Sequence, residues 1–231
     1  NEAGNIYNSL FAKNRKVEYD NKDIALVNIR TNPDNQIFRA MDDDEDIRIL
    51  AEDIKRNGLM HNLVVFPEQE EGSAVYVLLS GERRFRALNY LQEKGDATWN
   101  IVNCNVVTTP LTENEKKVLL YSANLQVRGG FSDEAIRRQA IAEFITCLQR
   151  EPYNMSREEA LNATKSVSTV NPRTIERDAR IEEKLKGKLK TLLNDKFLTR
   201  SECETYLRFE ADKQDEIANR FEKLQAVDCH S

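Results

Sequence analysis

The sequence predicts an α+β domain followed by an all-helical domain that contains a helix-turn-helix. Two observations predict this division. Before Pro110, short runs rich in Val, Ile, Leu and Phe alternate with segments of helical periodicity. After Pro110 three capping boxes mark helix starts, at Thr112-x-x-Glu115, Ser156-x-x-Glu159 and Thr199-x-x-Glu202. We therefore expect an N-terminal arm at residues 1–23, an α/β domain at 24–110 and a helical domain at 111–231.

The composition is that of a globular protein. The chain has 231 residues, of which 40% are hydrophobic and 32% charged. Its net charge of −5 argues against coating nucleic acid by bulk charge, so DNA binding requires a local basic face. No apolar run approaches the roughly 20 residues of a membrane span. The four cysteines form no C-x-x-C pair, so no zinc site is expected. Because no membrane span is predicted, we expect the protein in the cytoplasm.

The elements of the first domain follow from local signals. In order, we expect a strand at 24–29, a helix at 47–57, a hairpin of strands at 63–66 and 75–79, a helix at 82–93 and a strand at 101–107. Asn32-Pro33-Asp34-Asn35 is a turn signal, and the acidic stretch 41–46 supplies candidate helix caps. Gly58 stands where a left-handed residue ends a helix.

The second domain is predicted to consist of helices alone. They are expected at about 113–125, 132–150, 156–164, 172–193, 200–209 and 212–225. Asn171-Pro172 adds a further helix start, with Asn as N-cap and Pro at the first helical position. The helices on either side of residues 164–171 form a candidate helix-turn-helix near 156–185, with a connection slightly long for a tight one.

The sharpest local motif is Gly81-Glu82-Arg83-Arg84-Phe85-Arg86-Ala87. A strand leads to a glycine, and a helix begins at once. A helix N-terminus attracts anions, and arginines on its first turn can hold phosphate oxygens. Arg83 and Arg86 are three residues apart and therefore share a face. A surface helix whose arginines pair with Glu82 and Glu93 remains the alternative.

The same residues resemble the G-E-R-R-x-R-A box of ParB-family partition proteins. Asn32-Pro33 is similar to the start of that family's first conserved region, and Asn124-Leu125-Gln126 to part of its E-N-L-Q-R box. The resemblance covers roughly residues 24–225. It implies a ParB/sulfiredoxin-like α+β domain followed by an all-α helix-turn-helix domain. The corresponding turn, Ser80-Gly81-Glu82, has no cysteine, so a sulfiredoxin-type reductase is not expected.

The resemblance also implies a nucleotide site. In that family the box binds the triphosphate of CTP with Mg²⁺, and the nucleotide closes two subunits into a clamp around DNA. The implied nucleotide contacts here are Gly81, Glu82, Arg83, Arg84, Arg86 and Asn124, with Asn124 also on the metal side. Ala123 stands where the family has a glutamate, and Val127 where it has an arginine. A weak CTPase activity is therefore left open, and no catalytic residue is assigned.

The candidate DNA-reading helix carries a basic face. Its members follow one another at i, i+4, i+7 and i+11: Arg173, Arg177, Arg180 and Lys184. Thr174 lies near the N-terminal end, where recognition helices touch base edges. Four acidic residues interleave with them: Glu176, Asp178, Glu182 and Glu183. A merely solvated helix is therefore the alternative.

The sequence favours a ParB-like DNA-binding protein for partition of a plasmid, chromosome or mobile element, switched by CTP. The implied partners are double-stranded DNA, a second copy of the chain and a ParA-type ATPase, on the nucleoid or a plasmid. Ala123 and Val127 favour a nucleotide-independent transcription or copy-number regulator instead. A nuclease or nucleotide-dependent kinase on the same fold would use Glu82 as its carboxylate.

Overall fold

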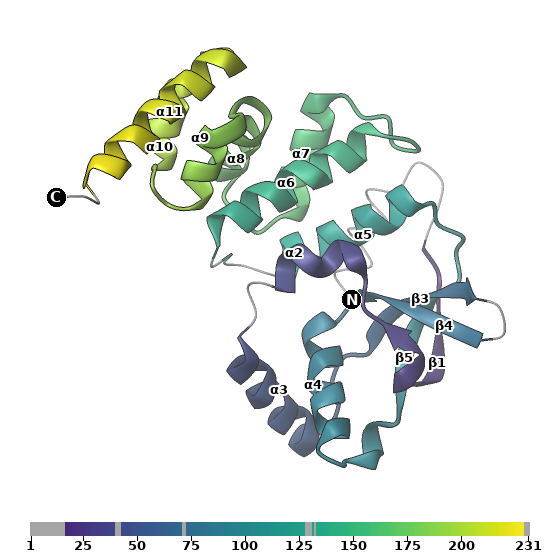
Figure 1. The fold of residues 1–231 in the computed structure, drawn as a ribbon. Helices are drawn as coiled ribbons and strands as arrows, with labels where there is room; N and C mark the ends of the chain where they lie inside the picture. Colours follow the sequence, from purple (N-terminus) through teal and green to yellow (C-terminus); the bar gives the residue numbers. More distant parts are fainter. Residues whose placement is uncertain (1–16, 40–42, 71–72, 128–130, 132, 229–231) are drawn as a thin grey trace.

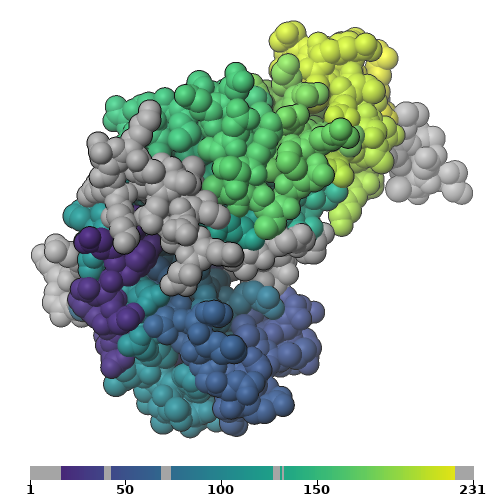
Figure 2. All heavy atoms as spheres, turned by 180° about the vertical axis from the view of Figure 1, so that it is seen from behind, coloured from purple at the N-terminus to yellow at the C-terminus, as the bar shows by residue number. Residues whose placement is uncertain are grey.

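The computed structural model describes residues 17–39, 43–70, 73–127, 131 and 133–228. Its N-terminal part is a mixed sheet with helices, and its C-terminal part is helical (Figure 1). Seen from behind, the yellow terminal helices lie at the end of the molecule away from the blue and teal α/β part (Figure 2). The predicted α+β domain followed by an all-helical one is confirmed.

The sheet has five strands in the order β1-β5-β3-β4-β2. Their bounds are Tyr19–Ala25 for β1, Ile29–Arg30 for β2, Leu63–Glu70 for β3, Ser73–Ser80 for β4 and Ile101–Val107 for β5. The β1–β5 and β3–β4 pairs are antiparallel, while β3–β5 and β2–β4 are parallel. Because β2 and β4 are parallel, their carboxyl ends meet at one edge of the sheet.

Helices cover both faces of this sheet. On one face lie α3 (Asp44–Asn57) and α4 (Glu82–Glu93), packed against inward residues such as Leu63, Val65 and Leu78. The alternate strand residues, among them Phe66, face Leu119 and Leu120 of α5 (Glu113–Val127). This is the period-two alternation of a sheet that is buried on both sides.

The two predicted domains share α5. While Leu119 and Leu120 lie on the sheet, Leu125 on the same helix belongs to the helical core. Phe38 of α2 (Gln36–Arg39) is fully buried in that core, with its ring 5.9 Å from the Tyr121 ring. Residues on both sides of Pro110 therefore build these two cores, and α5 ties the sheet to the helices.

The remaining elements complete the helical part. They are α6 (Glu134–Gln149), α7 (Arg157–Val167), α8 (Pro172–Lys184), α9 (Gly187–Asn194), α10 (Arg200–Tyr206) and α11 (Ala211–Asp228), with short 3₁₀ turns at Leu26–Asn28, Pro33–Asn35 and Ala97–Trp99. Within the part of the chain that the structure describes, no helix is long and apolar enough to cross a membrane.

Two expectations about individual elements are corrected. The single helix expected at 172–193 is two helices, because Gly187 has a φ of 47° and the Lys186 N–H donates to Gln214 Oε1 instead of continuing the helix. The strand expected at 24–29 begins earlier, as β1. Five of its seven residues are exposed, so it has no hydrophobic alternation to reveal it. The expected arm thus contributes a strand, and its residues 1–16 lie outside the described part.

Candidate functional site

The turn between β4 and α4 requires a glycine. Gly81 is the N-cap of α4 and has a φ of 103°, in the left-handed region. A Cβ atom there would lie 2.8 Å from Leu63 Cδ2 and 3.1 Å from Arg84 Nη2. Because the N-cap is a glycine, it supplies no side-chain cap hydrogen bond to α4. The motif therefore builds the tight strand-to-helix junction that the sequence predicts, with a helix N-terminus suited to an anion.

Arg84 braces this junction from within. Its Nη1 donates to the carbonyl oxygen of Asn62 over 2.9 Å and also to that of His61. Burial lowers the pKa of Arg84. Through these two hydrogen bonds, Arg84 connects the first turn of α4 to the residues that lead into β3. Arg84 is half-buried, and Glu82 in the same turn is buried. The geometry gives Arg84 a role in holding the turn.

Arg83 and Arg86 lie on the side of α4 that faces α3. Arg86 Nη2 is 3.1 Å from Asp44 Oδ1, and Arg83 Nη2 is 3.9 Å from Asp46 Oδ2. The Arg83 side chain is 47% exposed and that of Arg86 26%. The two arginines thus face the same neighbouring segment, as their spacing predicts, and the carboxylates opposite them come from the first turn of α3.

The second box lies close to the same sheet edge. Asn124 Nδ2 donates to the Leu120 carbonyl over 2.9 Å and to Asn35 Oδ1 over 3.4 Å. Asn35 follows β2, whose carboxyl end meets that of β4 and hence Gly81. An ion pair of 3.1 Å between Lys117 and Asp34 adds to this contact. The fold therefore brings the Asn32–Asn35 turn, the Gly81 turn and Asn124 to one edge.

No metal centre is evident at this edge. Among the described residues, no group of three or more His, Cys, Asp or Glu side chains could hold a metal ion. The metal role of Asn124 stays a prediction. Ala123, half-buried, is the neighbour that replaces the family's glutamate, and the side chain of Val127 lies outside the described part.

The connection in the candidate helix-turn-helix is shorter than the sequence predicts. Because α7 continues to Val167, which is buried, only residues 168–171 separate it from α8. The Thr169 N–H donates to the Leu125 carbonyl over 3.2 Å. Asn171 caps α8 by accepting from the Arg173 N–H over 2.9 Å. The turn is therefore attached to the C-terminal end of α5, one residue beyond Asn124.

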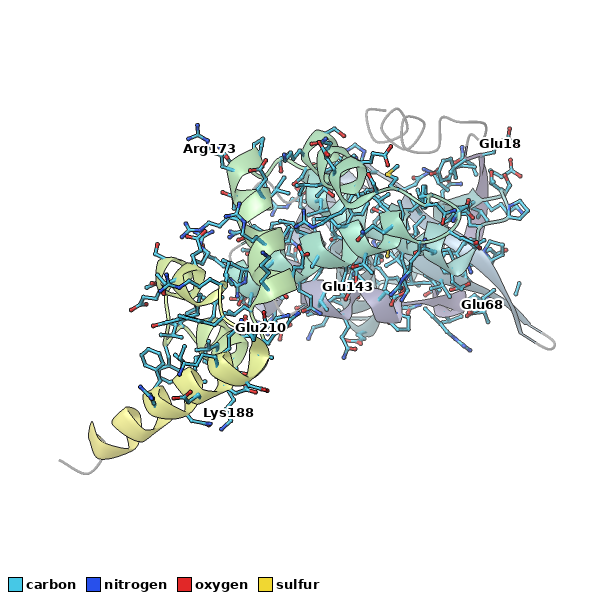
Figure 3. All side chains as sticks on the ribbon, turned by 90° about the horizontal axis from the view of Figure 1, so that it is seen from above. Glu18, Glu68, Glu143, Arg173, Lys188 and Glu210 are labelled. Carbon is cyan, nitrogen blue, oxygen red and sulfur yellow. The ribbon has the colours of Figure 1, made fainter. Side chains whose placement is uncertain are left out.

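The cations of α8 differ in their surroundings. Arg173, Arg180 and Lys184 are exposed, and among the described residues none is joined to a carboxylate by an ion pair. Figure 3 shows Arg173 directed away from the body of the protein. Arg177 is instead held by α10, with its Nη2 2.6 Å from Glu204 Oε2 and 3.1 Å from Ser201 Oγ. Thr174 is half-buried in the first turn.

The interleaved acids of α8 point toward neighbouring helices. Their partners on α7 are Lys165 for Glu176, at 2.5 Å, and Arg157 for Glu183, at 2.6 Å; their partners on α6 are Arg137 for Asp178, at 2.7 Å, and Arg138 for Glu182, at 3.4 Å. The hydrogen bond from Lys165 lowers the pKa of Glu176. These acids therefore hold α8 against its neighbours, and the charges of Arg180 and Arg173 also contribute to the lowered pKa of Glu176.

Sequence reasoning missed the buried part of this network. Arg138 is 1% exposed, and its Nη2 donates to Asn194 Oδ1 over 2.6 Å. Asp178 is fully buried between Arg137 and Arg200, whose Nη1 lies 3.6 Å from it. The available signal was the pair Arg137-Arg138 within the predicted helix α6, although surface cations give the same pattern.

Comparison with known proteins agrees with this fold. Residues 10–115 match the family model described as the ParB N-terminal domain. A solved Pnob8-like ParB-N domain is similar with a TM-score of 0.51 and 11% identity, covering 90% of this chain and 99% of that one. A further pNOB8-like ParB N-domain has a TM-score of 0.48, 11% identity and 92% coverage of both chains.

A third structure is the C-terminally truncated chromosome-partitioning protein ParB from Caulobacter crescentus, complexed with CTP-gamma-S. It has a TM-score of 0.36 and 18% identity, and the match covers 87% of this chain and 98% of that one. Among curated proteins, no sequence matches this chain.

Proposed function

We propose that this chain, whose residues 10–115 belong to the ParB N-terminal domain family, is a ParB-like partition protein that binds double-stranded DNA through α8. The observation that carries the proposal is the outer face of α8, where Arg173, Arg180 and Lys184 are exposed while the interleaved acids are bound to α6 and α7. Such a face supplies the local positive charge that the overall charge of −5 does not.

The arrangement supports a recognition helix in the major groove. In helix-turn-helix proteins the N-terminal residues of the second helix contact base edges, which places Arg173 and Thr174 there. Arg180 and Lys184, farther along the face, would contact phosphates and fix the register without specifying sequence. Homodimerisation, a ParA-type ATPase partner and a location on the nucleoid or a plasmid in the cytoplasm follow from the family resemblance as parts of the proposal.

The DNA proposal is tested by mobility shift with a pool of duplex fragments over a range of salt. The triple variant R173A/R180A/K184A is compared with K22A/K55A/R56A, which removes three exposed cations from the α/β part. Each lost phosphate contact lowers the slope of log affinity against log salt by about 0.9. The proposal expects a loss for the first variant alone, and equal losses in both would reject α8 as the interface.

We further propose that the sheet edge at Gly81 binds CTP. Arg83 and Arg86 would hold phosphate oxygens at the N-terminus of α4, with Asn124 on the adjoining helix, while Gly81, Glu82 and Arg84 maintain the turn. Mg²⁺ on the phosphates would neutralise part of their charge, and it usually retains waters and few protein ligands. This suits a site where, among the described residues, no group of three or more His, Cys, Asp or Glu side chains could hold a metal ion.

Calorimetric titration with CTP and ATP in the presence of Mg²⁺ tests this site. Arg83→Ala is compared with Arg56→Ala, an exposed arginine near the C-terminal end of α3. CTP-selective binding that is lost only in Arg83→Ala supports the proposal, and product release over hours would show whether CTP is hydrolysed. Absence of binding, with and without DNA, would reject the nucleotide site.

A nucleotide-independent transcription or copy-number regulator is the second candidate. The observation that favours it is that Arg84 is turned inward and Arg83 and Arg86 both face carboxylates. This candidate predicts that CTP does not change the DNA affinity of the parent protein. It also predicts that Arg83→Ala binds DNA as tightly as the parent.

A further inference from the structure

The first turn of α3 is strongly acidic and faces the arginines of α4. It reads Asp43-Asp44-Glu45-Asp46. Asp43 is the N-cap and accepts from the Glu45 N–H over 3.0 Å, while Glu45 pairs with Arg48 on its own helix. Asp44 and Asp46 are the two acids whose partners lie on another element. Their positions are thus set by the contact between α3 and α4.

The two contacts involve the arginines of the proposed nucleotide site. Arg86 and Asp44 form a hydrogen-bonded ion pair of 3.1 Å, and Arg83 and Asp46 a looser one of 3.9 Å. The carboxylates are 84% and 59% exposed. Solvent therefore reaches both pairs, and an ion from solution can compete for either arginine.

We propose that the first turn of α3 is an internal competitor for the phosphate groups of the nucleotide. The inference rests on the proposed nucleotide site and adds its regulation. An entering triphosphate has to replace the carboxylates of Asp44 and Asp46 on Arg86 and Arg83, and it meets repulsion from the same acidic turn. Nucleotide therefore binds only when this turn withdraws from α4.

The packing of α3 confines that movement to its beginning. Ile47, Ala51 and Ile54 are buried in the core between α3, α4 and the sheet. The acidic turn precedes them and has exposed side chains. Release of the turn is therefore compatible with an unchanged core. The position of the acidic turn then depends on whether phosphate is bound at α4, and any surface that contacts the start of α3 is affected by that change.

The test measures binding of CTP with Mg²⁺ and of inorganic tripolyphosphate by calorimetry. Asp44→Asn/Asp46→Asn removes both competitors and keeps the Asp43 cap. The matched control, Glu52→Gln/Glu68→Gln, removes two exposed carboxylates from α3 and β3 without touching the arginines. Glu52 lies eight residues from Asp44, roughly 12 Å along the helix. Asp44→Asn alone is the second variant, for use if the double variant unfolds at the assay temperature.

Because exposed ion pairs are weak, we expect the double variant to bind about three- to tenfold more tightly than the parent. The control should bind like the parent. Measurable binding in the double variant alone also supports the proposal. Equal affinity in parent and double variant overturns it and leaves the nucleotide site standing. Absence of binding in every protein overturns both the competitor and the nucleotide site.

Discussion

Helices α4 and α8 each present three arginines, but the two arginine sets differ in the carboxylates that surround them. In both, one arginine is bound internally: Arg84 by backbone carbonyls and Arg177 by Glu204. The others differ. Arg83 and Arg86 face carboxylates of α3, whereas Arg173 and Arg180 extend from a helix whose acids are turned away.

The difference shows that the direction of the acids decides what a basic helix can do. Both helices mix acidic and basic residues, so charge counts do not distinguish them. On α8 the acids form ion pairs with α6 and α7, and we propose that the outer face binds a polyanion. On α4 the competing acids come from another element, so phosphate binding there requires a rearrangement.

The largest predicted effect comes from removing an inward acid of α8. Asp178→Ala leaves Arg137 and Arg200 without their buried carboxylate, and breaking a buried ion pair costs about 3–5 kcal/mol. Urea unfolding followed by circular dichroism measures this loss. Glu183→Ala is the control, since its exposed pair with Arg157 contributes about 1 kcal/mol or less. Equal losses would show that the buried acids do not orient α8.

The next effect concerns the turn that presents the arginines of α4. Gly81→Ala forces a side chain into a left-handed residue and places its Cβ 2.8 Å from Leu63. We expect a cost of about 2–3 kcal/mol from strain and the steric clash together. Gly95→Ala isolates the backbone part, at about 1 kcal/mol, because Gly95 has a φ of 87° with nothing within 4 Å of its added Cβ. If Gly81→Ala were as stable as Gly95→Ala, the contact between the added Cβ and Leu63 would not be what requires a glycine at position 81.

The helices that carry both arginine sets were predictable because their start signals are local. Gly81 after a strand and Asn171-Pro172 before a periodic run specify where α4 and α8 begin. The ParB-like α/β domain was likewise confirmed, since residues 10–115 match the family model of the ParB N-terminal domain. Capping and periodicity depend on residues within one turn, which a sequence displays directly.

What escaped prediction depends on contacts between distant residues. The break at Gly187 is held by Gln214, and the competitors of Arg83 and Arg86 lie about forty residues earlier in the chain. Strand β1 is an exposed edge strand without alternation. In each case the deciding partner comes from another element, so no local pattern reveals it.

A smaller effect is expected from freeing the bound arginine of α8. Glu204→Gln removes the carboxylate that holds Arg177 and adds one available cation beside Arg173 and Arg180. If α8 binds DNA, affinity should rise about threefold, and the salt slope should steepen by about 0.9. Salt-dependent mobility shifts measure both, with Glu210→Gln, an exposed acid before α11, as control. An unchanged slope would mean that Arg177 stays out of reach of the phosphates.

The smallest effect is a pH dependence of the contact between α7 and α8. The hydrogen bond and charge of Lys165 lower the pKa of Glu176. A carboxyl with a lowered folded-state pKa contributes stability above its unfolded pKa, about 4.3, and loses that contribution as pH falls through the folded value. Glu176→Gln should therefore be less stable than the parent at pH 7, and the gap in melting temperature should close toward pH 3. A gap that persists in acid would mean that Glu176 acts through packing, and the acids of α8 would then orient it by shape more than by charge.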